Sequence, residues 1–194
     1  MDNDLLSFWT HYCRLDVSHA DWLATHAILF SVKRGQHLFE PDDDGYRRDY
    51  LYFVCGGLLG TLWWDEWGNR RIDRFLAPTD SALTTHNLYT SRPVNYFVIA
   101  MRSSTVIRVR ADALKAYKEA CLEADVLSDV LEHKKLKQYR AKNRLMLIKD
   151  EQERYREFVA DSYMKPIRLL TSQQEQADYL NISRRTITRA MGGL

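Results

Sequence analysis

The chain has 194 residues, of which 45% are hydrophobic and 28% charged, so it can bury a sizeable core and is neither disordered nor of low complexity. No run approaches the roughly 18 apolar residues of a membrane helix, and the N-terminus is acidic where a secretory signal is basic. Residues 1–100 hold 9 basic and 13 acidic residues, whereas residues 101–194 hold 19 and 13, which favours a polyanionic partner for the second half. We therefore expect a cytoplasmic protein without membrane contact.

The first 30 residues predict short amphipathic helices, because apolar side chains recur at steps of three and four positions. From residue 31 to about residue 110 the pattern changes to short runs of aromatic and β-branched residues between turn signals. The expected strands are 51–54, 58–64, 71–75, 96–101 and 105–109, with turns at 56–57 and 65–69. Strands at this even spacing predict an antiparallel barrel or roll.

Residues 112–149 contain no proline and no turn signals, which permits long helices. One helical stripe there is mostly apolar, at alternating steps of four and three positions. It contains Leu127, Leu131, Lys134, Gln138, Ala141 and Leu145. We interpret this stripe as the interface of a homodimer, in which the helix pairs with its own copy. A helix that lies on the roll of its own chain needs the same stripe, so this alternative stays open.

The same helix carries a run of basic residues with no acidic residue between them. The run consists of Lys134, Lys135, Lys137, Arg140, Lys142 and Arg144. It fits either a surface for a polyanion or a solvated helix face.

Residues 150–194 predict a small helical domain with a helix-turn-helix. Asp150, followed by Glu153, is the expected N-cap of its first helix. A helix-turn-helix needs a small residue where its helices cross and a residue that tolerates a left-handed backbone at its turn. Ala177 and Asn181 meet these needs, and Ser183 is the expected N-cap of the second helix. The expected contacts to DNA phosphates and base edges come from Ser183, Arg184, Arg185, Thr186, Thr188 and Arg189. An ordinary helical hairpin with a basic face is the alternative.

Three segments carry a family resemblance: residues 51–58 (LYFVCGGL), 64–69 (WDEWGN) and 178–189 (DYLNISRRTITR). They resemble the strand-glycine-strand signature, the following hairpin and the helix-turn-helix of the Crp/Fnr superfamily of bacterial transcription regulators. The resemblance covers nearly the whole chain.

The resemblance implies an α+β fold in three parts. A cyclic-nucleotide-binding-like β-roll, which is a jelly roll or double-stranded β-helix, would occupy residues 1–111. A long dimerisation helix would occupy 112–149, and a DNA-binding domain 150–194. The dimer would bind an inverted repeat of double-stranded DNA, with Arg184 and Arg189 as base readers.

Some positions depart from the family pattern. Gln176 replaces the aliphatic residue expected before Ala177, which would remove a core contact. Arg185 stands where an acidic reader is common, which implies a changed operator preference. The sequence reaches Leu194 without the usual β-wing after the second helix. These departures keep a second function open, a ligand-sensing or protein-interaction module on the same fold that does not bind DNA.

The resemblance also locates an effector pocket. In the family a Gly-Glu pair and an Arg-Ser or Arg-Thr pair hold the cyclic nucleotide, and the matched positions here hold Leu83-Thr84 and Val94-Asn95. Because the phosphate then meets no cation, we expect a degenerate pocket that does not respond to cyclic AMP. The residues expected to line a pocket for an unknown small molecule are Thr84, Thr85, His86, Arg92 and Asn95.

No further chemistry stands out in the sequence. The cysteines Cys13, Cys55 and Cys121 are too few for the family's four-cysteine iron-sulfur cluster, and neither they nor the histidines have metal-ligand spacing. Motifs for phosphate-binding loops, dinucleotides and activated nucleophiles are missing. We therefore expect no metal, no cofactor and no enzymatic activity.

Overall fold

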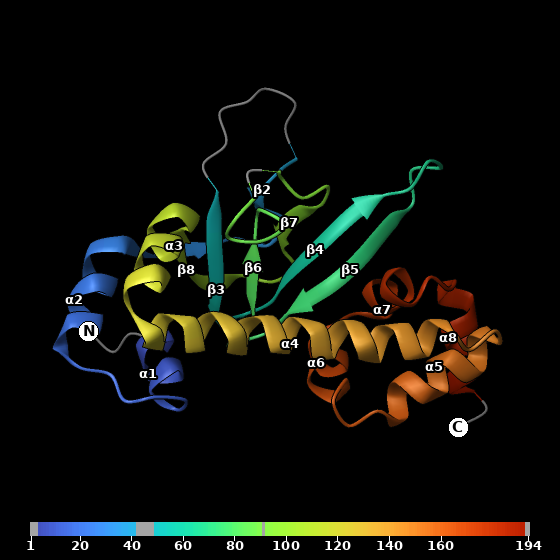
Figure 1. Cartoon of the computed structure of the whole chain (residues 1–194). Helices are drawn as coiled ribbons and strands as arrows, with labels where there is room; N and C mark the ends of the chain where they lie inside the picture. The colour runs from blue at the N-terminus through green and yellow to red at the C-terminus, as the bar shows by residue number, and fades with distance from the viewer. Residues whose placement is uncertain (1–3, 42–48, 91, 193–194) are drawn as a thin grey trace.

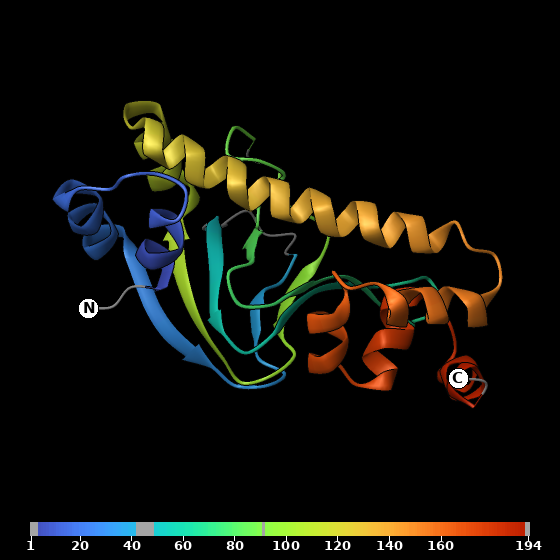
Figure 2. The same ribbon diagram turned by 90° about the horizontal axis from the view of Figure 1, so that it is seen from below.

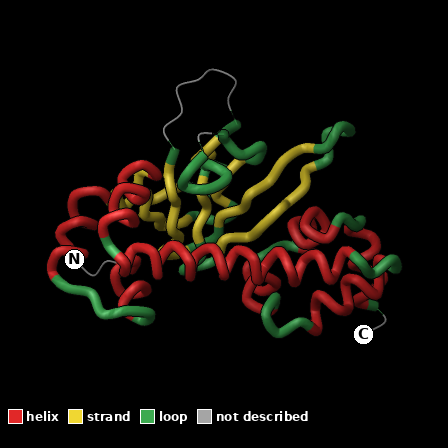
Figure 3. Tube along the Cα trace, viewed as in Figure 1, coloured by secondary structure: helices red, strands yellow, loops and turns green. Residues whose placement is uncertain are grey.

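The computed structural model describes residues 4–41, 49–90 and 92–192, and its strands form one body with helices at both ends (Figures 1 and 3). The N-terminal and roll elements are α1 (Asp4–Thr10), α2 (Val17–His26), β1 (Ala27–Val32), β2 (His37–Phe39), β3 (Tyr50–Gly56), β4 (Leu59–Trp64), β5 (Arg70–Leu76), β6 (Ser81–Leu83), β7 (Phe97–Ala100) and β8 (Ser104–Arg110). The helices that follow are α3 (Ala111–Ala120), α4 (Leu122–Met146), α5 (Glu151–Ala160), α6 (Lys165–Leu170), α7 (Gln173–Leu180) and α8 (Arg184–Met191).

The strands form two four-stranded antiparallel sheets, with the orders β1-β8-β3-β6 and β2-β7-β4-β5. An apolar core lies between them, in which Val54, Leu59, Val98 and Val106 are fully buried. This arrangement confirms the predicted antiparallel roll and α+β class. The five predicted strands correspond to β3, β4, β5, β7 and β8, whereas β1, β2 and β6 were not predicted.

The turn between β3 and β4 requires glycine. Gly57 has a φ of +87°, and a Cβ built there would lie 2.4 Å from the carbonyl oxygen of Ser103. A side chain at this position would therefore collide with the turn that joins β7 to β8. The predicted β4–β5 turn is held by Asp65, whose carboxylate accepts hydrogen bonds from the amides of Trp67 and Asn69.

Helix α4 runs along the roll and continues over the C-terminal helices, as Figures 1 and 2 show from two sides. The apolar part of its predicted dimer stripe faces its own chain. Leu127 and Leu131 are buried in the core that α4 shares with β3, β8 and the N-terminal helices. Leu145 is buried in a second core, against which Ala141 packs, and which joins β4 and β5 to the C-terminal helices.

The two polar residues of the stripe also bind the roll. The amide of Gln138 donates a 3.0 Å hydrogen bond to the Phe75 carbonyl, and the ammonium of Lys134 donates to the carbonyl of Thr79 and pairs with Asp80. The prediction that this stripe is a dimer interface is therefore wrong for this structure. The structure agrees with the alternative, in which the stripe packs on the roll of the same chain.

Much of the basic run on α4 has partners within the chain. Lys142 donates to the carbonyls of Ile72 and Asp73, and Lys135 pairs with Glu132 on the same helix. Because these charges are already neutralised or hydrogen-bonded, the run is not an open surface for a polyanion. No helix in the described part of the chain is long and apolar enough to cross a membrane.

Candidate DNA-binding helix and ligand pocket

Helices α7 and α8 form a helix-turn-helix with regular caps. Helix α7 begins with a capping box between Ser172 and Glu175 and ends at Asn181, whose φ of 53° and ψ of 46° are left-handed. The side chain of Ser183 caps α8 by accepting a 3.0 Å hydrogen bond from the amide of Thr186. The predicted conformation of Asn181 and the predicted cap at Ser183 are both confirmed.

Gln176 does not leave a defect in the helix-turn-helix core. Its side chain is buried, and its amide nitrogen lies 3.1 Å from the carbonyl oxygens of both Arg168 and Thr171. Its amide oxygen accepts a hydrogen bond from the Tyr155 hydroxyl. The expected loss of a core contact is therefore wrong, because this residue connects α5, α6 and α7 through hydrogen bonds.

The outer face of α8 is basic. Arg184, Arg185, Thr188 and Arg189 are exposed, and within residues 4–41, 49–90 and 92–192 none of the three arginines forms an ion pair. Their guanidinium groups are therefore free to meet phosphates or base edges.

Two residues that were predicted to contact DNA form hydrogen bonds within the chain instead. The Thr186 hydroxyl is buried and lies 2.8 Å from the Glu151 carboxylate, so this side chain fastens α8 to α5 and is not available to DNA. Ser183 is exposed, but its hydroxyl is occupied by the helix cap.

Two ion pairs fasten the helix-turn-helix to the roll. Arg102, in the turn between β7 and β8, makes two 2.7 Å hydrogen bonds to Glu175. Arg70 of β5 donates to Asp178 over 2.8 and 2.6 Å. These residues are far apart in sequence, and no local pattern could have paired them. Together they fix the orientation of α7, and through the turn that of α8.

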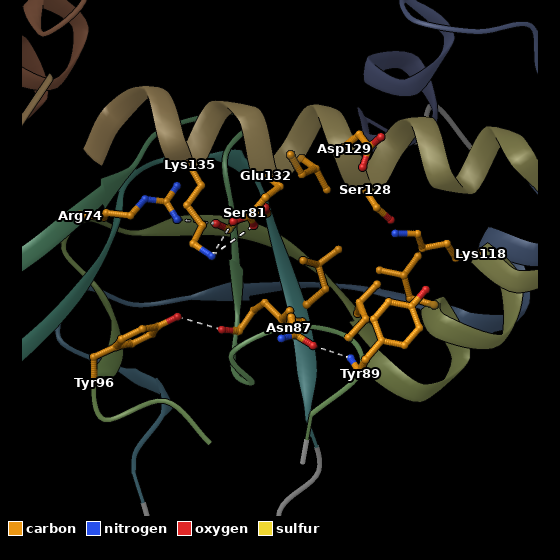
Figure 4. Close-up of a pocket in the computed structure, with 15 residues that line it drawn as sticks. Arg74, Ser81, Asn87, Tyr89, Tyr96, Lys118, Ser128, Asp129, Glu132 and Lys135 are labelled. Atoms are coloured by element: carbon orange, nitrogen blue, oxygen red, sulfur yellow. Dashed lines mark hydrogen bonds and ion pairs between the residues drawn. The ribbon is translucent and has the colours of Figure 1, made fainter. Parts of the chain in front are cut away.

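A pocket of about 280 Å³ lies between the roll and α4 (Figure 4). Arg74 and Tyr96 stand at one end and Lys118 and Tyr89 at the other, while side chains of α4 cover it (Figure 4). Its lining residues are Leu51, Arg74, Ser81, Leu83, Asn87, Leu88, Tyr89, Tyr96, Leu114, Lys118, Ser128, Asp129, Leu131, Glu132 and Lys135. The mixture of leucines with both charge signs suits a small molecule that has an apolar part and polar groups.

None of the five residues predicted for the effector pocket lines this pocket. Thr84 is fully buried, and its hydroxyl bonds the backbone of Tyr50, which joins two segments of the roll. The Thr85 hydroxyl donates to a backbone carbonyl two residues on. His86, Arg92 and Asn95 are exposed outside the pocket. The pocket instead takes Asn87, Leu88 and Tyr89 from the same loop, together with apolar side chains of the roll and the face of α4.

Comparison with known proteins shows the fold. No protein-family model matches the sequence, and no curated protein matches it. Among solved structures, FixK2 from Bradyrhizobium japonicum has a TM-score of 0.70 and 20% identity over 87% of this chain and 84% of its own. A mutant of CooA from Carboxydothermus hydrogenoformans has a TM-score of 0.74 and 15% identity over 100% and 84%.

A candidate transcriptional regulator of the Crp/Fnr family from Eubacterium rectale has a TM-score of 0.73 and 16% identity over 98% of this chain and 87% of its own. The chain therefore has the fold of the Crp/Fnr regulators, with a cyclic-nucleotide-binding-like roll, a long helix and a C-terminal helical domain. This finding confirms the fold that the sequence motifs predicted.

Proposed function

We propose that the protein is a DNA-binding transcription regulator of Crp/Fnr type, which binds an inverted repeat of double-stranded DNA as a homodimer. The observation that carries the proposal is the exposed face of α8, where Arg184, Arg185 and Arg189 form no ion pair with any acidic residue that the structure describes. A basic helix that follows a left-handed turn and a capped N-terminus is suited to lie in the major groove.

The three arginines have different expected roles. Arg184 and Arg189 would each contact a guanine edge, and the loss of such a contact costs about 1–3 kcal/mol and relaxes the preference at one base pair. Arg185 would contribute to operator preference at the position where related proteins often have an acidic residue. Contacts to phosphates would appear as a dependence of affinity on salt concentration.

The dimer would use the outer face of α4, because the opposite face is buried against its own chain. Leu122, Leu136 and Leu147 are exposed, and their positions fall on one side of the helix, opposite Leu127 and Leu131. A copy of α4 packed against this side would bury all three leucines and place two copies of α8 on one face of the dimer.

The pocket between the roll and α4 is the proposed effector site. Lys118 and Lys135 are paired with Asp125 and Glu132, so the cation that favours an anionic ligand is Arg74, whose guanidinium forms no ion pair in the described residues. The leucines beside it favour an apolar part of the ligand. Because α4 lines the pocket and also contacts the DNA-binding domain, a ligand that contacts Ser128 or Glu132 would influence the position of α8.

The test is selection of bound sequences from a randomised duplex DNA library, followed by fluorescence anisotropy on the selected duplex at several salt concentrations. Arg184→Ala and Arg189→Ala should each weaken binding about 5- to 150-fold. Arg156→Ala is the matched control, because Arg156 is an exposed arginine of α5 outside the helix-turn-helix. If no duplex is enriched, the non-DNA-binding alternative replaces this proposal. Equal losses in all three variants would refute the assignment of α8.

A further inference from the structure

A second group of chemically capable side chains lies at the other end of α4, where α2 meets the junction between α3 and α4 (Figure 1). His19 belongs to α2, Cys121 stands between α3 and α4, and Glu123 belongs to the first turn of α4. One donor atom from each of these residues lies within 4.8 Å of the other two. The sequence shows no such group, because His19 is 102 positions away from Cys121.

The spacing of the three donors is that of a tetrahedral metal site. The His19 Nε2 atom lies 3.5 Å from the Cys121 sulfur and 3.8 Å from a Glu123 carboxylate oxygen, and this oxygen lies 3.3 Å from the sulfur. Zinc bonds of ordinary length to nitrogen, sulfur and oxygen place tetrahedral ligand atoms about 3.4–3.6 Å apart. Movements of a few tenths of an ångström would therefore bring all three atoms into one coordination sphere.

The imidazole of His19 is oriented as in many metal sites. Its Nδ1 atom lies 2.7 Å from the carboxylate of Asp16, and the ring is buried edge-on against Trp9 and Tyr117. With the proton on Nδ1, the ring donates to this carboxylate, gives up the acceptor role that Nδ1 has toward the Asp16 amide at 3.1 Å, and directs the lone pair of Nε2 at the cluster. A carboxylate behind the histidine is the usual outer partner of a metal ligand, since it fixes the ring and raises the basicity of the other nitrogen.

No lysine or arginine in the described part of the chain is paired with Glu123, the carboxylate of the cluster. A carboxylate, a sulfur and an imidazole lone pair thus converge without a fixed positive charge between them.

We propose that His19, Cys121 and Glu123 bind one divalent transition-metal ion of the zinc type, with the fourth position open to water. A thiolate with an imidazole favours zinc over calcium or magnesium, which prefer sites made of oxygen atoms. On binding, the Cys121 thiol gives its proton to solvent and the thiolate enters the coordination sphere. The ion would tie α2 to the first turn of α4, and so fix the end of the helix that lies opposite the helix-turn-helix.

A catalytic arrangement of Cys121, His19 and Asp16 is the other chemistry that these contacts suggest. The carboxylate of Glu123, 3.3 Å from the sulfur, opposes it, because a fixed negative charge disfavours a free thiolate. The same carboxylate is a third ligand for a metal ion. A metal site therefore gives Glu123 a role, whereas a catalytic arrangement of Cys121, His19 and Asp16 does not.

The test uses the full chain, freed of metal with a chelator and kept reduced with a phosphine. Zinc is titrated against a chromophoric chelator, and cobalt(II) is then added as a spectroscopic probe. We expect one ion per chain, with the intense visible bands of tetrahedral cobalt and a sulfur-to-cobalt charge-transfer band in the near ultraviolet. Cys121→Ser should remove the charge-transfer contribution of this sulfur and weaken binding by at least 100-fold, and His19→Gln should weaken it similarly. Asp16→Asn should weaken it about 10- to 100-fold.

Cys55→Ser and His26→Gln are the matched controls, since both residues lie outside the cluster, and they should bind both metals like the parent. Circular dichroism of each metal-free variant separates loss of binding from loss of folding. If His19→Gln does not fold, the cobalt spectrum of Cys121→Ser tests the proposal instead. This variant should still fold, because serine differs from cysteine by one atom. Absence of stoichiometric binding in the parent would overturn the proposal. So would a cobalt spectrum that is unchanged in Cys121→Ser, or one that is lost in Cys13→Ser and retained in Cys121→Ser.

Discussion

Replacing Gln176 with leucine, the type of residue that the family pattern predicts, should destabilise the C-terminal domain. The change removes two hydrogen bonds of 3.1 Å to backbone carbonyls, those of Arg168 and Thr171, and one of 3.3 Å from the Tyr155 hydroxyl. At about 1 kcal/mol for each bond, the loss is about 3 kcal/mol. Burial of the added apolar surface returns about 1 kcal/mol. The net expected loss is therefore about 2 kcal/mol.

The measurement is urea unfolding followed by far-ultraviolet circular dichroism. Gln174→Leu serves as the control, because Gln174 is an exposed residue of the same helix and its substitution should change the free energy of unfolding by less than about 0.5 kcal/mol. A Gln176→Leu protein as stable as the parent, or more stable, would refute the reasoning. It would show that an aliphatic core at this position is better than the hydrogen bonds.

Three further outcomes are expected. Leu127→Asp should cost several kcal/mol of folding stability by burying a charge, whereas Leu136→Asp should lower only the dimer fraction in sedimentation; the reverse pattern would contradict the assignment of the two faces of α4. Burial raises the pKa of Glu175, but the hydrogen bonds from Arg102 and Ser172 and the charge of Arg102 together outweigh it, so the pKa is lowered. The ionised Glu175 side chain therefore contributes its full stability above its ordinary pKa of 4.5, and this stability is lost as the pH falls through the lowered pKa. Urea unfolding of Glu175→Gln should not show this loss of stability in acid. Cyclic AMP should give no saturable heat at micromolar concentration in calorimetry, because the residue matched to the phosphate-binding arginine is the buried Val94; saturable heat would restore a cyclic-nucleotide sensor.

The helix-turn-helix could be predicted because its determinants are local. The left-handed turn at Asn181 and the cap at Ser183 depend on residues within a few positions, and their chemistry is visible in the sequence. Thr186 was assigned wrongly because its partner, Glu151, lies 35 positions away. The roll shows the same limit, since β2 and β6 have three residues each and exist only through pairing with β7 and β3.

The pocket and the cluster of His19, Cys121 and Glu123 could not be predicted, because each joins segments that are distant in sequence. The sequence does show that the loop around His86 is polar, but polarity does not say whether a loop faces a cavity or solvent. The cluster of His19 and Cys121 needs α2 to lie beside the start of α4. Only the packing of α1 and α2 against the roll and α4 creates that position.

The stripe on α4 shows how one pattern can support two structures. A seam between two copies of a helix and a contact between a helix and its own roll both need apolar residues at steps of three and four positions. Leu127 and Leu131 therefore cannot separate the two cases. Lys134 and Gln138 do separate them, because both donate hydrogen bonds to backbone carbonyls of the roll.

In a symmetric seam, each of these polar side chains would face a copy of its own stripe. Two Lys134 ammonium groups near one axis would repel each other, whereas the carbonyl of Thr79 and the carboxylate of Asp80 give one such group the acceptors that it needs. Carbonyl groups near the end of β5 and in the turn between β5 and β6 thus explain the polar positions that a dimer interface leaves unexplained. A polar donor within an apolar helical stripe is therefore evidence that the helix packs on the backbone of its own chain, and it leaves the outer face of α4 open for the proposed second copy.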